Sequence, residues 1–395
     1  MKAGHVYLDD SDEDEGDVYI DDCDIVQEID LNEEDLPDAS DDDVIDSSDE
    51  SDRQIADAND DSVQKFVGHT GEVYSVACSP VNAALVATGG QDDKGFVWNI
   101  GGNWVTEVKG DHRESVSCLA FSSYGHLLAS GDVNGLLHIW DHLGNQKQRF
   151  DIGAELEWVK WHPSGHLVLA GSADHNVYMW DADEGTLHQT FSGHGKSVTC
   201  GDFTPDGNIV CTGSEDGTLR IWDPASGRRI HVVKGDEFPL ICLAMKADST
   251  LALTGTAGGF VHVSNIKTGK VVSSLSVHEG PVNCVGISPS IPWGATGGAD
   301  GKLIIWDMER LAPRSECIHE EQKGVKCLAW IGASRVVAAG CKGGKILLWD
   351  CLSGECFRVL RGHSRTIESL SVSADQSFLV SASRDGTARV FDLRR

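Results

Sequence analysis

Positively charged residues are scarce in this sequence. The 395 residues include 32 Lys and Arg against 62 Asp and Glu, a formal net charge of −30. A nucleic acid is therefore a poor candidate for a direct partner, because phosphate groups bind to positive charge.

The sequence also lacks the signals of secreted and membrane proteins. The N-terminus has no basic region followed by an apolar one, so we expect no secretory signal. Gly, Ser, Thr and Pro interrupt the uncharged stretches near 249–266 and 282–299, so we expect no membrane-spanning helix and no membrane partner. These absences predict a soluble, monomeric protein of the cytoplasm, and its acidic composition leaves the nucleus open as a second location.

Short catalytic and metal-binding motifs are missing as well. There is no GxSxG and no HExxH, and the 12 Cys form no CxxC pair. GHGKS at 193–197 looks like the end of a phosphate-binding loop, but Thr190 stands where its first Gly should be and a strand pattern follows it. We therefore expect no enzymatic activity, no cofactor, no zinc site and a reducing compartment.

The negative charge is concentrated in residues 1–62. This segment holds 26 Asp and Glu against Lys2 and Arg53, a net charge of −24, so the rest of the chain carries only −6. Such a composition has too few apolar groups to offset the entropy of ordering, and we predict a disordered acidic tail. Its role is either to keep the protein soluble or to attract basic partners.

The remainder of the chain is repetitive. GSEDGTLRIWD at 213–223 has close copies elsewhere, and the final aromatic position of each copy recurs every 40 to 43 residues. This position is occupied in eight units by Trp98, Trp140, Trp180, Trp222, Val263, Trp306, Trp349 and Phe391. Within each unit, alternating apolar and polar runs separated by turn residues predict three short antiparallel strands, and the segment after each WD predicts a fourth. No helical periodicity competes with this pattern.

Several units also repeat a polar set that can form a hydrogen-bonded chain between strands. The complete sets are His69, Thr88, Asp92 and Trp98 in unit one, His194, Thr212, Asp216 and Trp222 in unit four, and His278, Thr296, Asp300 and Trp306 in unit six. Unit eight keeps His363, Ser381 and Asp385, whereas Ala257 and Gly343 replace the Asp of units five and seven. Because the set recurs at the period of the repeat, and an enzyme does not need several copies of an active site, we interpret it as structural and not as a catalytic triad.

A period of 40 to 45 residues that starts near Gly-His and ends at Trp-Asp resembles the WD40 repeat. The resemblance implies an all-β, eight-bladed propeller with one four-stranded blade per unit. We assign residues 63–395 to this domain and residues 1–62 to the tail. The chain ends on the third strand of unit eight, so we predict that a strand at 63–69 completes the last blade and closes the ring.

One stretch makes the resemblance specific to a single family of WD-repeat proteins. Cys118, Cys200, Cys242, Cys284 and Cys327 share one position of their units, but in LEWVKWHP (156–163) Trp158 takes that place. Trp158 either fills the space between two blades or offers an aromatic anchor to a partner. LEWVKWHP, TGGQDDKGFVW (88–98) and IHVVKG (230–235) resemble the angio-associated migratory cell protein family. That family includes a fungal WD-repeat chaperone of a large-subunit ribosomal protein. The resemblance implies capture of the basic N-terminal segment of that client and its delivery to pre-60S particles.

Charge in the loops that join one unit to the next supports a basic partner. These loops carry Glu72, Glu114, Glu155, Asp236, Glu237, Glu279, Glu320 and Glu321. Lys196 and Arg365 make the fourth and eighth loops basic. Polar loops in general explain any one of these residues, but six loops of one sign favour a binding face. The alternative function is a general WD40 scaffold or adaptor, such as a substrate receptor or a part of signalling or cell-migration complexes.

Overall fold

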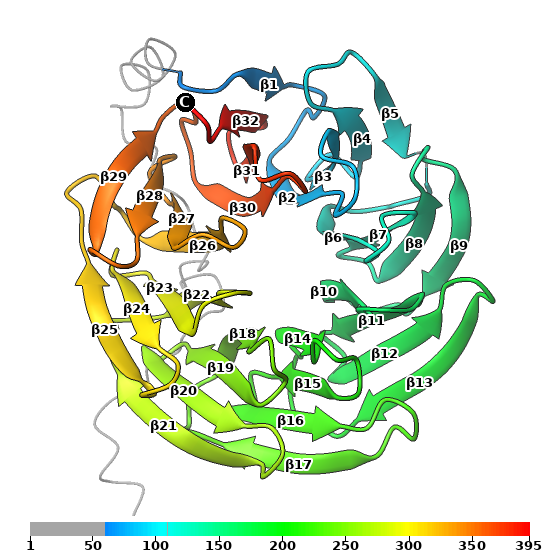
Figure 1. Ribbon diagram of the computed structural model, residues 1–395. Helices are drawn as coiled ribbons and strands as arrows, with labels where there is room; N and C mark the ends of the chain where they lie inside the picture. Colours follow the sequence, from blue (N-terminus) through cyan, green and yellow to red (C-terminus); the bar gives the residue numbers. More distant parts are fainter. Residues whose placement is uncertain (1–59, 109) are drawn as a thin grey trace, which may run out of the picture. The chain divides into compact units, whose positions relative to one another are not determined.

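The fold was analysed in a computed structural model, which describes residues 60–108 and 110–395. Within these residues the chain forms 32 strands in eight four-stranded sheets, and each sheet is antiparallel throughout. Figure 1 shows the sheets as the blades of a ring, with the first strand of each blade nearest the centre. The prediction of an all-β, eight-bladed propeller is confirmed. The tail predicted for residues 1–62 lies outside the described residues except for its last three positions.

The first four blades follow one another along the chain, each with its strands numbered from the centre outward. Blade one consists of β2 (Val73–Cys78), β3 (Leu85–Gly90), β4 (Gly95–Asn99) and β5 (Val105–Val108). Blade two consists of β6 (Val116–Phe121), β7 (Leu127–Asp132), β8 (Leu136–Asp141) and β9 (Gln146–Asp151). Blade three consists of β10 (Leu156–Trp161), β11 (Leu167–Ser172), β12 (Asn176–Asp181) and β13 (Thr186–Ser192). Blade four consists of β14 (Cys200–Phe203), β15 (Val210–Gly213), β16 (Thr218–Trp222) and β17 (Arg229–Lys234).

The second half repeats this arrangement. Blade five consists of β18 (Leu240–Met245), β19 (Leu251–Thr256), β20 (Phe260–Asn265) and β21 (Lys270–Ser276). Blade six consists of β22 (Val282–Ile287), β23 (Trp293–Gly298), β24 (Leu303–Asp307) and β25 (Ala312–Cys317). Blade seven consists of β26 (Val325–Trp330), β27 (Val336–Cys341), β28 (Ile346–Asp350) and β29 (Glu355–Leu360). Blade eight consists of β30 (Ile367–Val372), β31 (Phe378–Ser383), β32 (Ala388–Asp392) and β1 (Gln64–Phe66).

Apolar side chains are buried between neighbouring blades. Most second and third strands are buried along nearly their whole length, with β12 the main exception, so most of them expose little of either face to water. One cluster joins Val73 and Val86 of blade one to Val380 and Ala388 of blade eight. Each interface of this kind removes apolar surface from water on both blades, so the stability of a blade depends on its neighbours.

Blade eight contains strands from both ends of the described chain. β1 pairs antiparallel with β32, with Gln64 opposite Val390 and Phe66 opposite Ala388. Phe66 also stacks on Trp98 of blade one, with ring centroids 4.9 Å apart. Residues 60–62, which composition placed in the tail, contact this blade, because Asp60 pairs with the buried Arg389 and the Asp61 N–H donates to the Arg361 carbonyl. The described residues contain no helix long and apolar enough to cross a membrane.

Candidate partner-binding face

Two kinds of chain reversal lie on one face of the ring. The first are the connecting loops, which join the fourth strand of one blade to the first strand of the next. The second are the inner turns, which join the second and third strands. Hydrogen bonds couple the two: in blade one the connecting-loop residue His69 lies 2.8 Å from Asp92 of the inner turn and 3.1 Å from Thr88 of β3. We call this surface the loop face. The turns between first and second strands and between third and fourth strands lie on the opposite face.

The polar sets read from the sequence come together on this face. In blade four His194 Nε2 lies 2.8 Å from Thr212 Oγ1, and Trp222 Nε1 donates to the same oxygen at 2.8 Å. In blade six the equivalent distances, from His278 and Trp306 to Thr296, are 2.9 and 3.1 Å. In blade eight His363 lies 2.7 Å from both Asp385 and Ser381. Blade one lacks the hydrogen bond from Trp to Thr, because Trp98 Nε1 has no hydrogen-bond partner among the described residues.

Burial sets the charge states within these sets. Burial lowers the pKa of His194 to about 4, although the nearby Asp216 opposes this shift. For Asp216 burial would raise the pKa, but hydrogen bonds from Thr218 and Gly195 and the neighbouring His194 outweigh it and lower the pKa to about 2. At pH 7 the pair is therefore a neutral imidazole beside a carboxylate. It holds a connecting loop to an inner turn, and the hydroxyl that His194 Nε2 contacts, that of Thr212, is fully buried and already accepts from Trp222.

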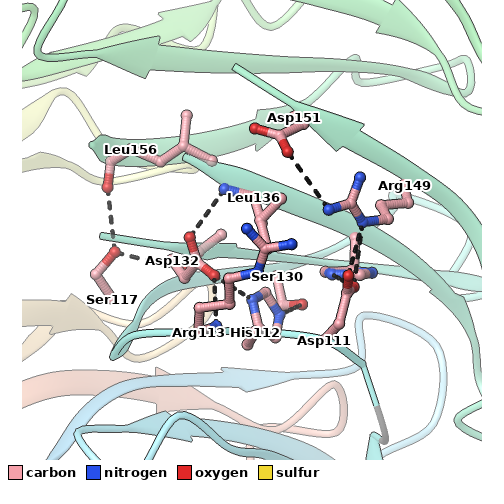
Figure 2. Close-up of polar contacts among 12 residues, drawn as sticks. Asp111, His112, Arg113, Ser117, Ser130, Asp132, Leu136, Arg149, Asp151 and Leu156 are labelled. Atoms are coloured by element: carbon pink, nitrogen blue, oxygen red, sulfur yellow. Dashed lines mark hydrogen bonds and ion pairs between the residues drawn. The ribbon is translucent and has the colours of Figure 1, made fainter. Parts of the chain in front are cut away.

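Blade two has a complete set that the sequence comparison missed. His112 lies 2.9 Å from Asp132 and 2.8 Å from Ser130, and Trp140 Nε1 donates to Ser130 at 2.8 Å. Figure 2 shows Asp132 between His112 and the N–H of Leu136, which donates to it at 2.8 Å. The Asp stands two residues after the Ser here, but four residues after the Thr in blades one, four and six. A search that allowed this shift would have found it.

Blades five and seven lack the Asp of the polar set, and in blade five the structure changes which residue replaces it. The register places Gly258, and not Ala257, at the position of Asp216, because Gly255 pairs with Val261 as Gly213 pairs with Leu219. In blade five the acid comes instead from the connecting loop, where Asp236 lies 3.2 Å from His262. Blade seven keeps His319, whose ring centroid lies 6.5 Å from that of Trp349.

The predicted acidic residues divide into two groups. Glu114, Glu155, Glu237, Glu279 and Glu320 are exposed on the loop face. Of these, only Glu279 has a cationic partner among the described residues, Lys302 at 3.5 Å. Burial and the neighbouring Glu157 raise the pKa of Glu155, so these two carboxylates lie close enough to repel each other. Glu157 is exposed on β10 and was not singled out in the sequence, because it belongs to a strand and not to a connecting loop.

Of the other three acidic residues, two are neutralised by cations of the protein and one is mostly covered. Glu72 pairs with Arg365 at 3.2 Å, and Glu321 pairs with Lys345 and Arg361, both at 2.7 Å. Asp236 is mostly covered and faces His262. The acidic residues that the sequence singled out are therefore only partly free to meet a partner. Carboxylates without a cationic partner among the described residues lie in the loops leading into blades two, three, five and seven, whereas Glu279 before blade six pairs with Lys302 and the contact of blade eight with blade one is internally paired.

Trp158 is not available to a partner as an aromatic anchor. Its side chain is buried between blades three and four, and its Nε1 donates to the Val198 carbonyl at 2.8 Å. A Cβ at Gly171 or Gly201 would collide with its ring, so glycine on each side makes room for it. The placement of Trp158 among the partner-binding residues is wrong, because the indole fills the space that Cys occupies elsewhere. Among the described residues no cluster of His, Cys, Asp or Glu could hold a metal ion.

Comparison with known proteins identifies the repeats. The model of the WD domain, G-beta repeat, matches residues 60–99, 104–141, 154–181, 185–223, 269–307, 315–350 and 354–392. Residues 224–268, which include the first three strands of blade five, lie between two matches. The human angio-associated migratory cell protein is 35% identical over 350 residues, which cover 84% of this chain and 80% of the human protein. The dog protein of the same name is also 35% identical over 350 residues, which cover 84% of this chain and 79% of the dog protein.

Two solved structures share the fold. Sqt1 from Chaetomium thermophilum bound to the N-terminus of the ribosomal protein L10 superposes with a TM-score of 0.78 at 22% identity, covering 85% of this chain and 100% of that one. Sqt1 from Saccharomyces cerevisiae gives a TM-score of 0.77 at 19% identity, covering 85% and 99%. At this level of identity the two similarities are evidence for the fold alone.

Proposed function

Because the chain belongs to the angio-associated migratory cell protein family of WD-repeat propellers, we propose that it is a non-catalytic binding protein of the cytoplasm. Its client is a newly made large-subunit ribosomal protein, whose basic N-terminal segment it holds and escorts toward pre-60S particles. The protein acts as a monomer and binds the segment on its loop face.

The observation that carries this proposal is the set of exposed, unpaired carboxylates on the loop face. An exposed carboxylate without an internal partner contributes little to folding. At Glu155, burial and then repulsion from Glu157 raise the pKa. A basic segment would relieve this repulsion at several loops at once. Many modest exposed pairs speed capture more than they strengthen the final complex, which suits a protein that must intercept a nascent client and later release it.

The Sqt1 structure is consistent with this assignment. It is a propeller of the same fold, and its bound ligand is the N-terminus of a ribosomal protein. A peptide with the N-terminal sequence of ribosomal protein L10 is therefore the probe of choice. We expect it to bind the full-length chain and to dissociate as salt is raised, since charges are screened beyond about 10 Å at 0.1 M salt and beyond about 3 Å at 1 M.

Charge reversal tests the location of the site. Glu114→Lys, Glu155→Lys and Glu279→Lys combined should weaken peptide binding at least about tenfold, because three attractive contacts become repulsive. None of the three side chains belongs to a His–Asp set. The matched control reverses Glu184, Glu309 and Glu355, which are exposed on the opposite face and change the net charge equally.

The outcomes separate the candidate functions. Weakened binding in the loop-face variant alone supports the proposal. Equal weakening in both variants would reduce it to non-specific charge attraction. A third outcome would identify the chain as a general scaffold. In that case the wild type does not bind the peptide, and purification from growing cells recovers a range of signalling or ubiquitin components in place of one ribosomal protein.

A further inference from the structure

One connecting loop presents an exposed aromatic ring. Phe238 lies in the loop between β17 and β18, and 45% of its surface is exposed. The other exposed aromatic residues in the described part of the chain, Trp104, Tyr124 and Phe357, lie outside the connecting loops. The equivalent positions in the other seven loops lie two residues before the first strand, or four in blade four, where that strand begins later. They hold Gly71, Glu114, Ala154, Lys196, Gly280, Lys323 and Arg365. An apolar ring at this position is therefore peculiar to blade five.

The ring is held in place from one side. A Cβ at Gly258 would collide with it, so the ring lies directly on the inner turn of blade five. Phe260 stacks on it with centroids 6.1 Å apart and planes 20° apart. The Phe238 N–H also donates to Asp236 Oδ1 at 3.1 Å. A partner would therefore meet an ordered surface and lose little entropy in binding it.

Carboxylates lie in the same loop as this ring and in the neighbouring inner turn. Asp236 and Glu237 precede it in the chain, and Glu237 is exposed. The loop lies across the inner turn of blade four, because a Cβ at Gly217 would stand 3.3 Å from the carbonyl oxygens of Asp236 and Phe238. Glu215 in that turn is exposed, and neither Glu215 nor Glu237 forms an ion pair with a described Lys or Arg.

A buried, unpartnered imidazole lies beneath the same loop. His262 is 2% exposed, and neither of its ring nitrogens makes a hydrogen bond among the described residues. Its Nε2 lies 3.2 Å from Asp236 Oδ2, and its ring stacks against Phe260 with centroids 6.2 Å apart. Burial lowers the pKa of His262, so the neutral ring leaves the negative charge of Asp236 uncompensated. Among the described residues no Lys or Arg forms an ion pair with Glu215, Asp236 or Glu237.

We propose that Phe238, together with Glu215, Asp236 and Glu237, forms a subsite for an arginine side chain of the bound basic segment. A guanidinium is planar, stacks on an aromatic face and forms paired hydrogen bonds with carboxylates, whereas the ammonium of lysine is a compact, strongly hydrated charge. This inference rests on the proposed function and adds to it a residue that discriminates between basic side chains. Phe238 supplies the flat surface and the carboxylates supply the charge.

The test titrates the labelled L10 N-terminal peptide against full-length variants by fluorescence anisotropy. Phe238→Leu keeps an apolar cover over Gly258 but removes the aromatic face, and it should weaken binding about fivefold. Phe357→Leu, at a 56% exposed ring on β29, is the control and should bind as the wild type does. Phe238→Trp keeps an aromatic face and should bind at least as tightly as the wild type.

A second peptide in which every Arg is replaced by Lys isolates the guanidinium. The Lys peptide should bind the wild-type protein more weakly than the original peptide does. The Phe238→Leu variant should bind the two peptides with nearly equal affinity. If Phe238→Leu retains full affinity while the three loop-face reversals weaken binding, the subsite is wrong and the proposed function stands. If the wild type does not bind the original peptide at all, both are overturned.

Discussion

The shifted acid of blade two offers a direct test of how the polar sets stabilise the propeller. Alignment of the repeats by sequence places Asn134 at the position of Asp216, whereas the structure places Asp132 in contact with His112. Asp132 is fully buried and accepts from His112 at 2.9 Å and from the Leu136 N–H at 2.8 Å. Asn134 is exposed and makes no side-chain hydrogen bond with the described residues.

The magnitude follows from these contacts. Asp132→Ala removes two strong hydrogen bonds and leaves a buried N–H and an imidazole without acceptors. At roughly 1.5 to 3 kcal/mol for each bond to a charged group, the free energy of unfolding should fall by about 3 to 6 kcal/mol. Asn134→Ala should change it by less than about 0.5 kcal/mol, as is usual for exposed sites.

Urea unfolding followed by tryptophan fluorescence measures both variants. Trp140 Nε1 donates to Ser130 in the same set, so the fluorescence should report on loss of this site. Equal effects of the two substitutions, or a larger effect of Asn134→Ala, would refute the assignment. The result would then mean that the set contributes packing and not hydrogen bonding to stability.

Two further predictions concern stability. Burial lowers the pKa of both His138 and His194 from 6.5 to about 4, so the unfolded chain binds more protons than the folded one between these pH values. The free energy of unfolding should therefore fall as pH drops from about 6.5 to 4, by up to roughly 3 kcal/mol per histidine. A free energy of unfolding that stays constant in urea titrations over this range would contradict the burial of both rings. Removing residues 1–67 should lower the melting temperature relative to removing residues 1–59, because it deletes β1 and leaves Arg389 buried without Asp60. An unpaired buried charge lowers the free energy of unfolding by about 3 to 5 kcal/mol. Identical melting curves of the two truncated proteins would show that β1 does not close the ring.

The architecture could be read from the sequence because a propeller is built from local, repeated elements. The spacing of Trp98, Trp140 and their equivalents reports the length of four short strands and their turns, and this length stays between 40 and 43 residues in every unit. The His and Asp of one set are 22 residues apart in blade four and belong to the same blade and the loop before it, so their pairing does not depend on the rest of the ring. The polar set of blade two was missed because its Asp occupies the same place in the blade from a different sequence position in the turn.

The binding face was predictable only in outline, because charge pairing depends on distances between parts of the chain that are far apart in sequence. Glu72 is neutralised by Arg365, 293 residues away, and Glu321 by Arg361, 40 residues away in the loop that leads into the next blade. The sequence determined that acidic residues gather in the connecting loops. Only the closed ring, which brings blade eight against blade one and the loop of Phe238 across blade four, decided which carboxylates remain free to meet a partner.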